Sequence, residues 1–242
     1  KAFAKIADHY EADQYDEALA GLDKLDTPKA SPYERGKIAQ LRGFIAYNQD
    51  DLVSAIEQFK IGIATDALPN VEHFQLKLTL AELYHMNDQL AESIAAFDDW
   101  LKDADAITGR NWALQAKNYF DQDDFENTLV FIDKAFATGD KPERAWQQMK
   151  ANSLLSLERT DEAIAFGREV LATAPDDAEF VNFLSALLLD AGKPEDAVAM
   201  LEALRSQGKL VKENLYINLY AAYRELERPK DAAAVMSEGI AK

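Results

Sequence analysis

The chain has 242 residues, of which 48% are hydrophobic and 29% charged, a composition typical of a globular protein that can bury a sizeable core. Its 43 acidic residues outnumber 26 basic ones and give a formal net charge of −17, so we expect neither nucleic-acid binding nor attraction to anionic membranes. Cysteine is absent, which excludes disulfides, thiol catalysis and thiolate metal sites. No apolar run reaches the roughly 20 residues of a membrane-inserted helix.

A helical pattern repeats seven times along the chain. In each copy, an apolar segment leads into a short polar turn, which is followed by a large apolar residue and a second segment with helical periodicity. One small residue follows each turn, and successive copies of it lie 37, 38, 35, 35, 34 and 35 positions apart. These residues are Ala18, Ala55, Ser93, Thr128, Ala163, Ala197 and Ala232. The spacing predicts helix pairs at about 1–30, 33–68, 70–105, 108–141, 143–176, 178–210 and 212–242.

Within each unit, the residue types fit two packed helices joined by a turn. Apolar side chains in residues 3–10 recur at i, i+3, i+4 and i+7, so they share one helical face. We expect Pro194 and Pro229 at the first position of a second helix, and Gly192 just after a first helix. Gly43 is expected where the partner helix approaches closely. A plain helical bundle does not explain the constant phase, so the pattern favours stacked units with a concave and a convex side.

The spacing and signature residues of these units resemble those of the tetratricopeptide repeat family. Trp112 and Tyr119 fit the first-helix signature in one unit, and Ala55-x3-Phe59 fits the second-helix signature in another. The resemblance covers the whole chain. It implies an all-α fold, a right-handed superhelical solenoid of about seven helix-turn-helix repeats that forms a single domain over residues 1–242.

The densest acidic cluster lies in the segment 119–132, where Asp121, Asp123, Asp124 and Glu126 occur within six positions. A calcium loop of the EF-hand type requires a glycine at its sixth position and a glutamate at its twelfth, and the segment has neither when it is counted from Asp121. We interpret Asp123 and Asp124 as a turn and the start of a second helix, where acidic side chains stabilise the positive end of the helix dipole.

No arrangement of residues predicts catalysis, a cofactor or a metal site. His9, His73 and His85 form no i, i+4 pair, and the chain contains no phosphate-binding, dinucleotide-binding or nucleophile-elbow glycine motif. We therefore expect a protein that is not an enzyme. The alternative, an enzyme or a small-ligand receptor, needs a polar pocket that the sequence does not indicate.

The family resemblance also implies a binding surface. In tetratricopeptide arrays the first helix of each unit builds a concave wall, and here that wall combines aromatic rings, amides and isolated charges. Such a surface suits an extended or helical peptide. The peptide-binding candidates are Lys37, Gln40, Phe44, Tyr47, Glu82, His85, Arg110, Lys117, Phe120, Gln148, Asn152 and Asn182, with Asn48 and Met86 beside them.

One specialisation of the family is disfavoured. Repeats that grip the acidic tails of heat-shock chaperones place lysine and asparagine at two fixed positions of one unit. In the second unit those positions hold Gln40 and Phe44, and in the third they hold Leu78 and Glu82.

Three segments, 31–47, 141–146 and 208–223, resemble a bacterial subgroup of these proteins more closely. Members of that subgroup accompany the TonB–ExbB–ExbD energy-transducing machinery and lie in the periplasm. The resemblance implies a role accessory to TonB-dependent energy transduction or transport, and a periplasmic location; the alternative location is the cytoplasm. The chain begins at Lys1 without a signal peptide, as expected of a mature or trimmed form.

We therefore expect a non-enzymatic scaffold that holds a protein or peptide partner in its concave groove. The alternative is a self-associating structural or assembly protein. The last unit closes on Ala233, Val235, Met236 and Ile240 with no polar capping helix after them, and exposed terminal faces of repeat arrays usually need such a cap. That alternative predicts a homodimer formed through a terminal repeat.

Overall fold

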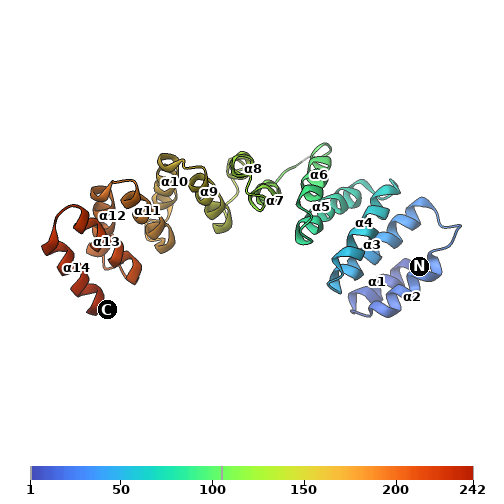
Figure 1. The fold of residues 1–242 in the computed structure, drawn as a ribbon. Coiled ribbons are helices and arrows are strands. Elements are labelled where there is room, and N and C mark those ends of the chain that lie inside the picture. The colour runs from blue at the N-terminus through green and yellow to red at the C-terminus, as the bar shows by residue number, and fades with distance from the viewer. Residues whose placement is uncertain (1, 105, 242) are drawn as a thin grey trace. The chain divides into compact units, whose positions relative to one another are not determined.

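The structure is a computed structural model that describes residues 2–104 and 106–241 and, within them, contains fourteen α-helices and no strand (Figure 1). The helices form seven consecutive pairs, in which the first is called the A helix and the second the B helix. The A helices are α1 (Ala2–Glu11), α3 (Pro32–Asn48), α5 (Asn70–Met86), α7 (Gly109–Phe120), α9 (Arg144–Ser156), α11 (Ala178–Asp190) and α13 (Glu213–Glu225). The B helices are α2 (Tyr15–Leu25), α4 (Leu52–Ala64), α6 (Leu90–Leu101), α8 (Phe125–Ala137), α10 (Thr160–Thr173), α12 (Pro194–Ser206) and α14 (Pro229–Ala241). The predicted all-α fold of about seven helix pairs is confirmed.

The helices divide into two compact units. Unit 1 comprises Lys1–Asp140 and contains α1 to α8, and unit 2 comprises Lys141–Lys242 and contains α9 to α14. The expectation that the seven pairs act as one domain stays a prediction. None of the described helices combines the length and the apolar character that crossing a membrane requires.

The small residue of each B helix lies in the core of its pair. All seven of these side chains are between 0% and 1% exposed. Ser93 illustrates the closeness of the two helices, because its Oγ donates a hydrogen bond to the carbonyl oxygen of Ala81 on α5 at 2.7 Å. The predicted repeat register is therefore the register in which the helices pack.

Gly43 allows the closest contact in the second pair. A Cβ atom built on Gly43 of α3 would lie 2.2 Å from a ring carbon of Phe59 on α4, and Phe59 is 0% exposed. The Phe59 ring also meets Phe44 in an edge-to-face arrangement, with ring centroids 5.0 Å apart. The missing side chain of Gly43 thus makes room for Phe59, and Phe59 supports Phe44.

The turn inside every pair contains one residue with a left-handed backbone. In each turn the N–H of the following residue donates to a carbonyl oxygen five positions back in the A helix, as Asp124 does to Tyr119 at 2.9 Å. The left-handed residues are Asp13, Asp50, Asp88, Asp123, Glu158, Gly192 and Glu227, so six of the seven are acidic.

The acidic segment 119–132 is one of these turns. Asp123 has a φ of 59°, and the Asp124 side chain accepts a hydrogen bond from the N–H of Asn127 at 3.1 Å, which caps the N-terminus of α8. The interpretation of these two residues as a turn and a helix start is confirmed. Pro194 and Pro229 likewise begin α12 and α14, as predicted.

We expect Gly43→Ala to lower the free energy of unfolding by about 1–3 kcal/mol, because the added methyl group collides with the buried Phe59 ring. The better helix propensity of alanine offsets up to about 1 kcal/mol of this cost. Gly167→Ala is the control, since its nearest neighbour lies 3.3 Å away and the cost there should be smaller. Urea denaturation measures both variants, and a Gly43→Ala protein as stable as the wild type would contradict the contact.

Candidate functional site

A cleft of ≈ 260 Å³ opens on the A helices of unit 1. Helices α1, α3 and α5 all contribute side chains to it, and three of the predicted groove residues, Phe44, Tyr47 and Glu82, line it together. The other lining residues are Tyr10, Asn48, Thr79, Leu83 and Met86. The structure therefore gathers part of the predicted groove around one concavity.

The cleft wall is partly fixed and partly exposed. Asn48 Nδ2 donates a hydrogen bond to the Tyr10 hydroxyl at 3.0 Å, which ties α3 to α1. Phe44 is half-buried and rests against the core of its pair. Tyr47 is 40% exposed and Met86 51% exposed, so both present apolar surface to a ligand. Large exposed apolar groups beside a concavity are typical of a binding surface.

Glu82 places a negative charge in this cleft. Its carboxylate has no hydrogen-bond or ion-pair partner among the residues that the structure describes, although it remains accessible. Desolvation by the surrounding side chains raises the pKa of Glu82 above its ordinary value of 4.5. The cleft therefore contains an accessible carboxylate that has no cationic neighbour among the described residues.

Lys37 and Gln40 hold two A helices together. Lys37 Nζ donates to Gln40 Oε1 and to Glu72 Oε2, both at 2.7 Å, and Glu72 belongs to α5. Gln40 is only 8% exposed. Both predicted groove residues are thus engaged within unit 1 and support the α3–α5 contact.

His85 connects the groove surface to a buried chain of amides. With a hydrogen on Nδ1, His85 donates to Asn118 Oδ1 at 2.8 Å, and Asn118 Nδ2 donates to Gln115 Oε1 at 3.1 Å. Gln115 Nε2 in turn donates to an Asp98 oxygen of α6 at 3.1 Å. Asn118 and Gln115 are both 0% exposed. This chain fixes the orientation of His85, and sequence reasoning missed it because two amides in a helix form no recognisable motif.

The predicted residues of α7 have different surroundings. Lys117 Nζ forms an ion pair with Asp121 at 2.6 Å, and His85 Nε2 lies 3.6 Å from the same carboxylate. Phe120 packs edge-on against the first residue of α8, at a centroid distance of 5.7 Å. Arg110 is exposed in the first turn of the helix. The structure thus brings Lys117 and His85 together through Asp121, but it does not place them in the cleft around Glu82.

The remaining predicted residues belong to unit 2. Gln148 Nε2 lies 3.5 Å from Glu179 Oε2, which links α9 to α11. Asn182 Oδ1 accepts a hydrogen bond from Asn218 Nδ2 at 3.1 Å, which links α11 to α13. Asn152 is exposed on α9. These side chains run along the A helices, and they line none of the described concavities.

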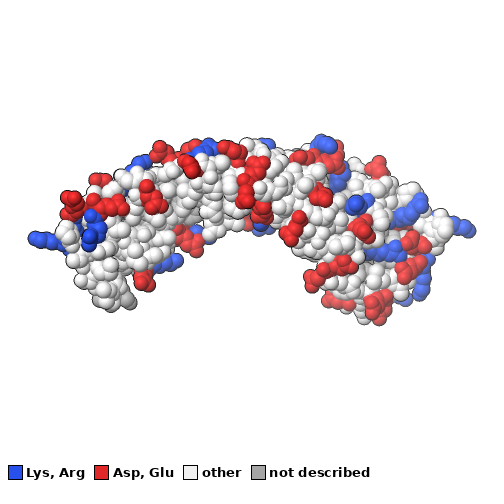
Figure 2. Space-filling view, in the orientation of Figure 1, with Lys and Arg blue, Asp and Glu red and all other residues white. Residues whose placement is uncertain are grey.

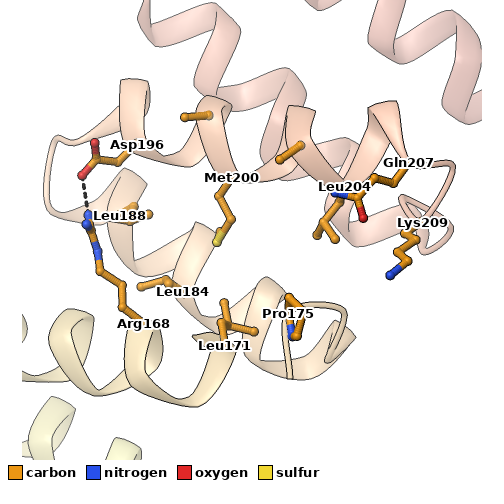
Figure 3. A pocket seen from close by; sticks show the side chains of 12 residues that line it. Arg168, Leu171, Pro175, Leu184, Leu188, Asp196, Met200, Leu204, Gln207 and Lys209 are labelled. Atoms are coloured by element: carbon orange, nitrogen blue, oxygen red, sulfur yellow. Dashed lines mark hydrogen bonds and ion pairs between the residues drawn. The ribbon is translucent and has the colours of Figure 1, made fainter. Parts of the chain in front are cut away.

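A larger hollow of ≈ 450 Å³ lies between α10, α11 and α12 of unit 2 (Figure 3). Figure 3 shows Met200 and Leu184 near its centre and the ion pair of Arg168 with Asp196, at 2.5 Å, at one end. Lys209 at the rim also has an anionic partner in unit 2. The charged side chains at the rim of this hollow thus pair with other residues of unit 2, so the hollow indicates no particular ligand.

The sequence contained one signal for this hollow. Ala203 lines it, whereas the equivalent repeat positions in α10 and α14 hold Glu169 and Glu238. Ala203 thus has a shorter side chain than its counterparts in those two helices.

The last helix pair presents a second apolar surface around a hollow of ≈ 450 Å³. Ile240 is 79% exposed, Val211 68% and Ile217 51%. Val235, which the sequence suggested as part of this face, is instead 0% exposed, because it packs inside its own pair. Among the described residues, no three His, Asp or Glu side chains converge in a way that could hold a metal ion.

Comparisons with known proteins identify the fold. The sequence of residues 154–211 matches the tetratricopeptide repeat family. Comparison with curated proteins gives no significant match in sequence.

Solved structures extend the likeness to nearly the whole chain. A tetratricopeptide repeat protein from Parabacteroides merdae is similar with a TM-score of 0.58 at 14% identity, over 99% of this chain and 91% of that one. YrrB, a TPR protein with an unusual peptide-binding site, is similar with a TM-score of 0.53 at 17% identity, over 78% of this chain and 90% of that one. A structure of Naa15/Naa10 bound to HypK-THB is similar with a TM-score of 0.63 at 15% identity, over 97% of this chain and 35% of that one. The chain therefore has the tetratricopeptide repeat fold.

Proposed function

We propose that the chain is a non-catalytic scaffold that holds a peptide, or an extended segment of a protein, against the A helices of unit 1. The observation that carries the proposal is the cleft between α1, α3 and α5, where exposed Tyr47 and Met86 stand beside the unpartnered carboxylate of Glu82. Apolar surface with a few polar groups in a concavity is what peptide recognition requires.

The contacts beneath this surface favour binding as well. The Lys37–Glu72 ion pair, the Tyr10–Asn48 hydrogen bond and the amide chain behind His85 hold neighbouring A helices in place. A wall that is already ordered loses little conformational freedom when a ligand binds, so more of the contact energy appears as affinity.

The fold supports the same class of function. YrrB, whose fold is similar, has a peptide-binding site, and Naa15/Naa10, also similar, is bound to HypK-THB. We extend the general role of a protein-binding scaffold to this chain, and we assign the binding surface from its own residues.

The test replaces exposed apolar side chains of the cleft. We expect the double variant Tyr47→Ser, Met86→Ser to lose roughly tenfold or more in affinity for peptides that the wild type selects from a random phage-displayed library, because central apolar contacts dominate binding energy. Fluorescence anisotropy with the selected synthetic peptides measures the change.

The matched control replaces two valines of B helices in the same unit that are at least as exposed as Tyr47. Val53 is 58% exposed on α4 and Val130 51% exposed on α8. Val53→Ser, Val130→Ser should leave the affinity within about twofold of the wild type. If the two double variants weaken binding equally, the A-helix surface is not the peptide site.

A second candidate function is self-association through the last helix pair. The exposed side chains of Val211, Ile217 and Ile240 surround a hollow there, and apolar patches of this kind often mark protein interfaces. We expect multi-angle light scattering to give a dimer at micromolar concentration and Ile217→Asp to give a monomer. A wild-type protein that stays monomeric would remove this candidate.

The partner class and compartment follow from the closer resemblance of residues 31–47, 141–146 and 208–223. On that ground we propose a periplasmic protein accessory to the TonB–ExbB–ExbD machinery. We expect the protein to fractionate with the periplasm of its native cell and to co-purify with a component of that machinery after cross-linking. Recovery from the cytoplasmic fraction would overturn the location.

A further inference from the structure

Glu82 is the one charged group that lines the cleft of unit 1. The other lining residues are aromatic, aliphatic or neutral polar, and none of them donates a hydrogen bond to its carboxylate in the described chain. Glu82 is solvent-accessible at the cleft, so a cationic group of a ligand can reach its carboxylate and form a charge-assisted hydrogen bond with it.

Three lysines on the A helices α3, α5 and α7 form ion pairs with carboxylates other than Glu82. Lys37 pairs with Glu72, and Lys117 pairs with Asp121. Lys77, which shares α5 with Glu82, pairs instead with Asp99 of α6 at 2.8 Å. Figure 2 shows Asp and Glu side chains spread over the visible surface of both units, with Lys and Arg among them. None of these lysines pairs with Glu82, which leaves its carboxylate open to a cationic group of a ligand.

The cleft wall suits the stem of such a cation. Tyr10, Phe44 and Tyr47 contribute three aromatic rings, and aromatic faces attract ammonium and guanidinium groups. Met86, which is 51% exposed, adds apolar surface on which the methylene chain of a lysine or arginine can pack. An acidic ligand would be repelled by Glu82, and a purely apolar one would desolvate the carboxylate further without pairing it.

We propose that this cleft recognises one basic side chain, lysine or arginine, of the bound peptide, with Glu82 as its counter-charge and the surrounding rings as its walls. The inference rests on the proposed function, since it names what the same surface selects.

The experiment uses the complete 242-residue chain and a random peptide library displayed on phage. Selection on the wild type should enrich peptides with a lysine or arginine at a fixed place in the consensus. For one such synthetic peptide, changing that residue to glutamine should weaken binding about tenfold or more, the usual loss for a charged hydrogen bond.

The protein variants then assign the effect to Glu82. Glu82→Gln should bind the basic and the glutamine peptide with affinities within about twofold of each other, and Glu82→Lys should bind the basic peptide more weakly than the glutamine peptide. Glu57→Gln is the matched control, because it removes the same charge from an exposed position on α4 and should keep the wild-type preference.

Stability measurements separate a loss of recognition from misfolding. Because the pKa of Glu82 is raised in the folded protein, its ionisation costs the folded state stability as the pH rises above the ordinary value of 4.5. Glu82→Gln should therefore be at least as stable as the wild type at pH 7, with any gain lost near pH 4, where both folded and unfolded chains hold the proton.

The possible results distinguish the two proposals. If no peptide is enriched, the proposed function and this inference both fail. If peptides are enriched without a basic residue, or if the basic preference survives in Glu82→Gln, the inference is wrong while peptide binding stands.

Discussion

The close approach of the A and B helices in each pair is the contact on which the rest of the structure depends. One alanine, serine or threonine of every B helix is buried almost completely, which lets two helix backbones pack with little space between them. In the second pair Gly43 has no side chain at the contact, which leaves room for the Phe59 ring. Phe59 in turn supports Phe44, which lines the cleft of unit 1. The shape of the candidate binding surface is therefore set from within the core of the pair, one layer beneath the exposed residues.

The excess of acidic residues has several structural uses, and they explain why acidic clusters here are no guide to a site. Six of the seven turns place Asp or Glu in the left-handed conformation, which Asp tolerates better than most residues with a side chain. Asp51 and Asp124 cap B helices, and Asp177 caps α11. Glu72 and Asp121 form ion pairs with Lys37 and Lys117, two of the predicted groove residues. Glu82 differs from these residues because it lines the cleft of unit 1 and forms no cap or ion pair among the described residues.

Two arginines, in the segments 31–47 and 141–146, link neighbouring helix pairs. Arg42, within 31–47, forms ion pairs with Asp23 of α2 at 2.7 Å and with Asp26, just after that helix, at 2.6 Å, so it links the second pair to the first. Arg144, within 141–146, pairs with Glu179 at 3.1 Å and links α9 to α11. These contacts stabilise the stacking of neighbouring pairs.

The sequence by itself determined the helix pairs, their register and the chemistry of their turns, because helical periodicity, small residues at close contacts and turn residues are local properties. It also placed Phe44, Tyr47 and Glu82 among the groove residues, through the family resemblance. Only the tertiary structure decided which polar side chains of the predicted groove already form ion pairs or hydrogen bonds within the protein. The pairing of Lys37 with Glu72 and the buried chain from His85 to Asp98 each join side chains of different helices, and the hollow beside Ala203 is lined by three helices. Such contacts depend on how neighbouring pairs pack, and for the same reason the isolation of Glu82 could not be read from its repeat position.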